Sequence, residues 1–194
     1  MYFLHCSIWA SKLVAEPFFR KILESKGLKL HVIKSIEDAK ALEGIEVGVS
    51  DWIVIDQQTI NRFAEATGDY QWIHVDEERA ARELPNGKTI AHGYLTLSLI
   101  PTLTVDFVHV ENLARALNFG CNKVRFYTMV PVGARVRARA TVLQARKRGG
   151  ALHLLSEIKI EVEGERKPAC VAETLGMYFF EEQAPAVAAT ARSA

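Results

Sequence analysis

The stretch that decides the fold is Thr89-Ile90-Ala91-His92-Gly93-Tyr94-Leu95-Thr96-Leu97-Ser98-Leu99-Ile100-Pro101. Drawn as a helix after Gly93, it is apolar on nearly every side, and such a helix is buried. Further along the chain, apolar and polar residues alternate as they do in half-buried strands, through residues 122–127, 135–142 and 158–162. Turns are expected between them, at 131–133, 148–150 and 163–165. We therefore predict an α+β fold, in which an antiparallel sheet wraps around a long buried apolar helix.

Before this stretch, the sequence predicts a helix that ends beside a carboxylate and an imidazole. Asp56 or Thr59 is the expected N-cap, and Gly68 the C-cap. Asp69 follows the helix end directly, and His74 comes five residues later. Because the chain turns sharply at a helix end, we expect Asp69 and His74 to approach each other and share one water as an acid/base pair. The alternative is a capping aspartate and a structural histidine.

Two motifs resemble those of a known family. Gly68-Asp69-x4-His74 and Ile90-Ala91-His92-Gly93 resemble the MaoC-like dehydratases, the (R)-specific enoyl-CoA hydratases of hot-dog fold. Residues 66–74, Ala-Thr-Gly-Asp-Tyr-Gln-Trp-Ile-His, look like the NodN-like branch of that family. The resemblance covers roughly residues 35–180. Gln71 and Trp72 stand where many (R)-hydratases have Asn and Pro, so both are candidate substrate-binding residues.

The resemblance implies reversible addition of water to trans-2-enoyl thioesters, which gives (3R)-hydroxyacyl thioesters. Asp69 and His74 would divide the two proton transfers, and the sequence leaves open which is base and which is acid. The backbone N–H of Gly93 would hold the oxygen that becomes enolate-like, and a glycine there lets the substrate approach closely. His92 beside it is expected to position the site. Neither a cofactor nor a metal is expected, because the coenzyme A thioester is itself the substrate.

Further residues are candidates for holding the substrate. Tyr94, Trp72 and Phe126 would line an acyl tunnel, although aromatic residues at such spacings are more often core. Arg146 and Arg148 flank Lys147 in an expected hairpin, and Arg135, Arg137 and Arg139 share one face of the strand before it. These basic residues suggest a landing site for the phosphates of coenzyme A or of an acyl-carrier-protein arm. The alternative is a solvated strand face.

Two other functions remain open beside a hydratase. A hot-dog acyl-CoA thioesterase would use a carboxylate on the buried helix, but residues 93–103 contain neither Asp nor Glu. A catalytically silent acyl-thioester binding protein would not need both Asp69 and His74. The sequence therefore favours the hydratase.

Composition is that of an ordinary globular domain. The 194 residues are 49% hydrophobic and 24% charged. A net charge of +1 gives no reason to expect nucleic acid or a membrane as partner. Cys6, Cys121 and Cys170 are odd in number and widely spaced, which indicates reduced thiols in the cytoplasm.

The sequence divides the chain into three parts. Residues 1–34 form an N-terminal extension with a short amphipathic helix between Pro17 and Gly27, residues 35–182 a hot-dog domain, and residues 183–194 a disordered tail. Within the domain we expect a helix from the capping box Ser35-x-x-Asp38 to Gly44, a strand from Val47 to Ile55 with Trp52 and Val54 facing the core, and a helix Glu77–Leu84 capped by Asp76. The resemblance further implies a homodimer or a higher even oligomer, with two sheets joined edge to edge.

Overall fold

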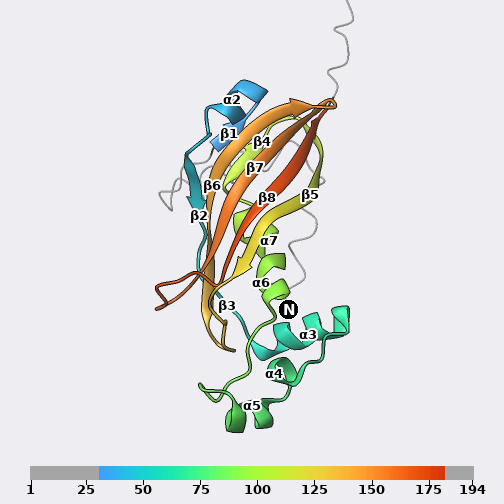
Figure 1. The fold of residues 1–194 in the computed structure, drawn as a ribbon. Helices are drawn as coiled ribbons and strands as arrows, with labels where there is room; N and C mark the ends of the chain where they lie inside the picture. The colour runs from blue at the N-terminus through green and yellow to red at the C-terminus, as the bar shows by residue number, and fades with distance from the viewer. Residues whose placement is uncertain (1–30, 182–194) are drawn as a thin grey trace, which may run out of the picture.

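The main sheet is antiparallel and curved around a helical rod (Figure 1). The computed structural model describes residues 31–181. Strands β6 (Arg135–Arg148), β7 (Ala151–Val162) and β8 (Cys170–Phe180) form a meander in the centre. β2 (Glu46–Val49) and β3 (Ile53–Val54) pair with β6, and β5 (Leu113–Phe126) pairs with β8, so the order is β2-β6-β7-β8-β5. The predicted α+β architecture is confirmed.

Alternation in the sequence explains the meander. The side chains of β6 that face the rod are small or branched and apolar, and all are buried: Val136, Ala138, Ala140 and Val142. Gly149 and Gly150 have φ of 57° and 77°, so the β6–β7 turn uses a left-handed backbone that glycine adopts without strain. Both hairpin turns lie where the sequence predicts them. β8 and the first part of β5 were not predicted, because their residues do not alternate clearly.

The helical rod consists of α6 (Gly93–Ser98) and α7 (Ile100–Thr104). Leu95, Ile100 and Leu103 are buried against the concave face of the sheet. Tyr94, in contrast, is 69% exposed. The prediction of burial on nearly every side is therefore too broad, because the sheet of one chain covers only part of the rod.

The segment before the sheet differs in detail from the prediction. The capping box of Ser35 and Asp38 is present, but α2 (Ile36–Lys40) ends before Gly44. The expected strand from Val47 to Ile55 is split into β2 and β3. Ser50 follows β2 directly, and its Oγ accepts a hydrogen bond from the N–H of Ala138. The prediction that Val54 faces the core is wrong, because Val54 is 57% exposed. Trp52 stacks on the Arg137 guanidinium, 4.4 Å from the ring centroid.

Three helices form the lower part of Figure 1 and lie beside the start of α6. α3 (Gln57–Thr67) begins at Asp56, whose Oδ1 accepts from the N–H of Thr59 at 2.8 Å, so Asp56 is the N-cap. α3 ends at Gly68 with φ of 75°, as predicted. α4 (Trp72–Val75) follows, and then α5 (Glu77–Glu83), which Asp76 caps as predicted. None of the helices in residues 31–181 is long and apolar enough to cross a membrane.

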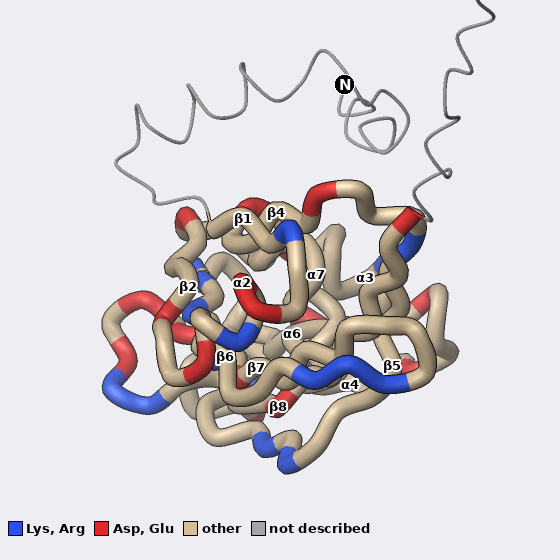
Figure 2. The backbone as a smooth tube through the Cα atoms, turned by 90° about the horizontal axis from the view of Figure 1, so that it is seen from above, with Lys and Arg blue, Asp and Glu red and all other residues tan. Residues whose placement is uncertain are grey.

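A small second sheet closes the upper end of the fold. β1 (His31–Ile33) and β4 (Val108–Val110) pair in parallel, and Figure 2 shows them side by side from above. β1 directly precedes the expected domain boundary at residue 35, which itself stays a prediction. The expected helix between Pro17 and Gly27 and the tail 183–194 lie outside the described residues.

Candidate active site

Asp69 and His74 come together because two short helices meet at a sharp turn. Gly68 ends α3 in a left-handed conformation, so the chain reverses and Asp69 lies at the surface. α4 then carries His74 into the interior, where it is buried. Asp69, His74 and His92 each offer one ligand-type atom within 4.8 Å of the others, and they are the group of residues in 31–181 that could hold a metal. The structure thus brings the two predicted acid/base residues together and adds His92 to them.

His74 is held as a neutral imidazole. Its Nδ1 lies 2.7 Å from the carbonyl oxygen of Ile90, so Nδ1 carries the proton and donates it. Nε2 is then left as an acceptor. Burial lowers the pKa of His74, the Ile90 carbonyl and Asp69 act in the opposite direction, and the charge of His92 lowers it further. The net effect is a lowered pKa, which favours the neutral form of the His74 ring at neutral pH.

His92 joins the two members of the pair. Its ring stacks on His74, with centroids 3.7 Å apart and 27° between the planes. Its Nε2 lies 2.9 Å from the backbone carbonyl oxygen of Asp69, so Nε2–H is the donor there. Phe63 of α3 also packs against His92, with 5.0 Å between the ring centroids. Nδ1 of His92 is buried and has no hydrogen-bond partner in the described part of the chain. The expected positioning role has a geometric basis, since His92 contacts both residues.

Gly93 begins the helical rod next to this pair. As the first residue of a helix, it has a backbone N–H without an acceptor inside the helix. A β-carbon at Gly93 would lie 3.2 Å from the Phe126 ring, so the ring covers this glycine. Tyr94 meets Phe126 edge to face at 5.9 Å, and the two rings are 69% and 44% exposed. These two aromatic residues therefore lie at the surface beside Gly93 and not in the core.

The other candidate residues lie at the edge of the pair formed by Asp69 and His74, which we call the dyad. Gln71 is exposed and precedes α4, and its N–H faces Asp69 Oδ1 at a long 3.4 Å. Trp72 packs on α5, where the guanidinium of Arg79 lies 4.1 Å from the ring centroid. Trp72 thus does not join Tyr94 and Phe126 in one aromatic group.

Two supporting residues were not found from the sequence. The amide nitrogen of Gln57, in the first turn of α3, donates to the backbone carbonyl of His74 at 2.8 Å. The hydroxyl of Thr89, which is 1% exposed, donates to the amide oxygen of Gln57. No local pattern marks these residues, because positions 57, 74 and 89 meet only in the folded chain.

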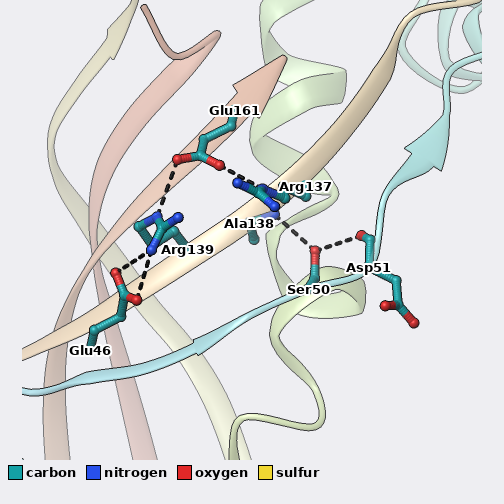
Figure 3. A network of polar contacts seen from close by, with 7 residues as sticks. All are labelled: Glu46, Ser50, Asp51, Arg137, Ala138, Arg139 and Glu161. Atoms are coloured by element: carbon teal, nitrogen blue, oxygen red, sulfur yellow. Dashed lines mark hydrogen bonds and ion pairs between the residues drawn. The ribbon is translucent and has the colours of Figure 1, made fainter. Parts of the chain in front are cut away.

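The basic residues of β6 fall into two groups. Arg135, Arg137 and Arg139 pair with carboxylates on the outer face of the sheet, in the network of Figure 3 and beside it. The carboxylate of Glu161 accepts hydrogen bonds from both Arg137, at 2.6 Å, and Arg139, at 3.1 Å. Arg146 and Arg148 lie at the β6–β7 turn, at the end of β6 away from the dyad. The structure of one chain does not bring them to Asp69 and His74.

A buried histidine, an exposed aspartate and the first residue of a helix thus lie together at the end of a sheet that wraps around that helix, in a hot-dog fold. Residues 38–162 match the model of the MaoC like domain. The chain belongs to this family.

The relatives agree with that assignment. The chain is 47% identical over 150 residues to "3-hydroxyacyl-thioester dehydratase Z" of Mycobacterium tuberculosis, covering 77% of this chain and 99% of that protein. It is 40% identical over 149 residues to "Nodulation protein N" of Rhizobium leguminosarum bv. viciae, covering 76% and 92%. The unliganded R-hydratase PhaJ1 of Pseudomonas aeruginosa has the same fold, with a TM-score of 0.53, 20% identity and coverage of 73% and 92%.

Proposed function

We propose that this chain is a hydro-lyase that catalyses the reversible addition of water to trans-2-enoyl thioesters, giving (3R)-hydroxyacyl thioesters. The observation that carries the proposal is the meeting of Asp69 and His74 beside the first residue of α6. The 47% identity to a protein named 3-hydroxyacyl-thioester dehydratase supports it. The substrate is a thioester of coenzyme A or of acyl carrier protein, and the reaction uses no further cofactor and no metal.

In the proposed mechanism, one water is bound between the Asp69 carboxylate and Nε2 of His74. One of these groups takes a proton from the water, and the oxygen forms a bond to the β-carbon of the enoyl chain. The electron pair of the double bond moves toward the thioester carbonyl, whose oxygen accepts the N–H of Gly93. A proton then passes from the pair to the α-carbon. The pair returns to its starting state, so water is the net reactant.

The substrate would enter beside the exposed aromatic residues. Tyr94 and Phe126 lie next to Gly93, where the thioester is placed. The N–H of Gln71 lies 3.4 Å from Asp69 Oδ1, and Trp72 follows Gln71 as the first residue of α4. We propose these four as substrate-binding residues, with His92 positioning the dyad. A thioesterase is disfavoured, because α6 and α7 contain no carboxylate to attack the thioester.

The test is to incubate the purified chain with crotonyl-CoA and longer enoyl-CoAs. Loss of the conjugated double bond measures hydration, and a thiol reagent measures release of coenzyme A. We expect hydration without thiol release, and a (3R) product by chiral chromatography. Thiol release alone would indicate the thioesterase, and an exclusively (3S) product would contradict the assignment.

The first prediction concerns the dyad. Asp69→Asn and His74→Ala should each lower turnover by roughly two to four orders of magnitude, since both proton transfers use these side chains. Circular dichroism should show an unchanged fold. Asp106→Asn and His153→Ala, which lie away from the site, are matched controls and should keep their turnover. Near-normal activity of either dyad variant would remove that residue from the mechanism.

Assembly follows from the free edge of β5. This strand of 14 residues ends the sheet, and most of its residues are exposed, including Leu117 and Phe119 at 49% and 60%. A long edge with exposed apolar side chains pairs readily with another strand. We propose a homodimer, or a higher even oligomer, joined through β5. The free thiols of Cys121 and Cys170 support a cytoplasmic location.

A further inference from the structure

Nδ1 of His92 stands apart from the other polar side-chain atoms of residues 31–181. It is buried and has no hydrogen-bond partner there, and the residue as a whole is 2% exposed. An unpaired buried polar atom lowers stability, so it calls for a bound water, a bound ion or a catalytic role. The proposed hydration does not use this atom, because His92 acts in it only by positioning the dyad. Nδ1 is therefore left for a ligand.

The two stacked histidines share one hydrogen-bond arrangement. In each ring one nitrogen faces a backbone carbonyl oxygen: Nδ1 of His74 faces that of Ile90 at 2.7 Å, and Nε2 of His92 faces that of Asp69 at 2.9 Å. A carbonyl oxygen only accepts, so these nitrogens carry the protons, and the other nitrogen of each neutral ring keeps its lone pair. Metal-binding histidines are held in the same way. Nε2 of His74 and Nδ1 of His92 are thus both prepared as ligands.

The third donor is the carboxylate of Asp69. Asp69, His74 and His92 each offer one ligand-type atom within 4.8 Å of the others. Around a tetrahedral zinc ion, with bonds of about 2.1 Å, the ligand atoms lie roughly 3.3 Å apart. The two rings are stacked and buried, whereas Asp69 is exposed, so rotation of the Asp69 side chain is the movement that closes the set. Three protein ligands leave the fourth position of the ion to water.

We propose that Asp69, His74 and His92 form a binding site for Zn²⁺, and that the bound ion inhibits hydration. Two imidazoles and one carboxylate suit Zn²⁺, whereas Mg²⁺ prefers oxygen ligands. The ion occupies the lone pair of His74 Nε2 and the Asp69 carboxylate, which are the two groups that bind and deprotonate water in the proposed mechanism. The inhibition rests on the proposed function, but the metal site does not. Zinc is then a reversible inhibitor of this chain and not its cofactor.

Calorimetry of the full chain with zinc chloride measures the site without any hydratase activity. Asp69→Asn removes the charge of one ligand and His74→Ala removes another ligand, so each should raise the Kd for Zn²⁺ by roughly tenfold or more. Magnesium chloride at the same concentration should show no binding, because it would have to accept two nitrogen ligands. Equal Zn²⁺ affinity in the wild type and in these two variants would overturn the site.

The variant His92→Gln separates metal binding by His92 from its positioning role. The amide nitrogen of glutamine can donate to the Asp69 carbonyl as Nε2 does, but glutamine has no lone pair at the place of Nδ1. The Kd for Zn²⁺ should rise by roughly tenfold or more, with the circular dichroism of the zinc-free protein unchanged. His92→Asn, whose side-chain oxygen lies near the place of Nδ1, should bind Zn²⁺ more tightly than His92→Gln. An unchanged Kd in both variants would overturn the role of His92 as a ligand.

Other ligand-type residues of the chain supply the matched control. His5 and Cys6 are adjacent in the sequence, and Cys121 is an exposed thiol, so all three can compete for zinc. The variant His5→Ala/Cys6→Ala/Cys121→Ala should keep the wild-type Kd for Zn²⁺. Loss of binding in this control would place the ion elsewhere and overturn the proposal.

Hydration of crotonyl-CoA measures the inhibition. Zn²⁺ at roughly ten times its Kd should lower the rate by roughly tenfold, and a chelator should restore it. A rate that is unaffected by saturating Zn²⁺ would overturn the inhibition. A wild-type chain that binds Zn²⁺ through these three residues but hydrates no enoyl thioester would contradict the proposed function and leave the metal site standing.

Discussion

Single residues set the charge state of the site. His74 is buried, its Nδ1–H is fixed by the Ile90 carbonyl, and its neighbour His92 is stacked on it. Asp69, in contrast, is exposed and remains open to water. The pair therefore combines a buried imidazole with an exposed aspartate.

The second prediction is that His74 titrates below its ordinary pKa of 6.5, because burial disfavours the charged ring. NMR of the ring protons measures the midpoint directly. Asp69→Asn should lower it further, since the Asp69 charge raises the pKa of His74. A midpoint above 6.5 in the wild type would contradict the assigned environment.

The same shift has a consequence for stability. Between the two pKa values the unfolded chain binds more protons at His74 than the folded chain does. The free energy of unfolding should thus be highest above pH 6.5 and fall as the pH falls through the lower, folded value. Urea unfolding from about pH 8 to about pH 5 measures this, and the slope should be smaller in His74→Asn.

The third prediction concerns Gly93. In Gly93→Ala the new methyl lies against the Phe126 ring, which is half exposed and can move outward. We expect turnover to fall by roughly tenfold or more, with the free energy of unfolding changed by about 1 kcal/mol or less. The double variant Gly93→Ala/Phe126→Leu removes the crowding, and Phe126→Leu alone is the control. Recovery of turnover in the double variant would assign Gly93 to packing and not to oxyanion binding.

The sequence indicated candidate site residues where they lie in local motifs, and their roles in catalysis stay predictions. Asp69 follows a glycine-capped helix, and Gly93 begins an apolar helix, so each carries a short-range pattern. Gln57 and Thr89 carry none. Their roles depend on the contact of α3 with the residues before α6, and this contact forms only when distant parts of the chain pack together.

At the scale of elements, the side-chain amide of Gln57 links α3, α4 and residues 89–91, which precede α6. The side-chain oxygen of Gln57 accepts a hydrogen bond from the Thr89 hydroxyl, and the side-chain nitrogen donates to the backbone carbonyl of His74. These two bonds connect the three segments that contain the candidate site residues. The segment 89–91 is anchored from the other side as well, since the N–H of Ala91 donates to the carbonyl of Val130. The site is thus fixed by hydrogen bonds between elements and not by any single helix.

The fourth prediction follows from that bridge. Gln57→Leu leaves the buried Thr89 hydroxyl and the His74 carbonyl without their partner, and should cost about 1–3 kcal/mol in urea unfolding. Asn61→Ala is the matched control, because Asn61 also bonds to Gln57 but is exposed. It should change stability by about 0.5 kcal/mol or less. Equal stabilities of the two variants would show that the bridge is not significant.

Helix caps were predictable at this scale, whereas strand continuity was not. Asp56, Gly68 and Asp76 cap helices where the sequence places them, because capping is decided by a few neighbouring residues. The break at Ser50 depends on a hydrogen bond to Ala138 of a distant strand. No local pattern indicates this break, and Val54 after it is exposed instead of facing the core.

At the scale of the whole molecule, the edge of β5 is the surface at which we propose that two copies assemble. The strand is long, lies at the end of the sheet and presents apolar side chains. It also ends at the candidate active site, so a partner bound along it would contact the region of Phe126. Assembly and substrate binding are therefore expected to be coupled.

The fifth prediction tests the seam. Leu117→Glu places a charge on the exposed edge and should convert the dimer to a monomer, as measured by light scattering. Leu143→Glu is the control, because Leu143 is also an exposed leucine, at 39%, but lies on the interior strand β6. A dimer that survives Leu117→Glu unchanged would place the interface elsewhere.

The order of the strands along the chain has a consequence for synthesis. The rod of α6 and α7 precedes every strand of the meander that buries Leu95, Ile100 and Leu103. A chain emerging from the ribosome therefore exposes this apolar face until β8 has been made. Exposed apolar surface of this kind promotes aggregation and is what chaperones bind. The helix that begins at Gly93 would thus make the nascent chain a chaperone substrate.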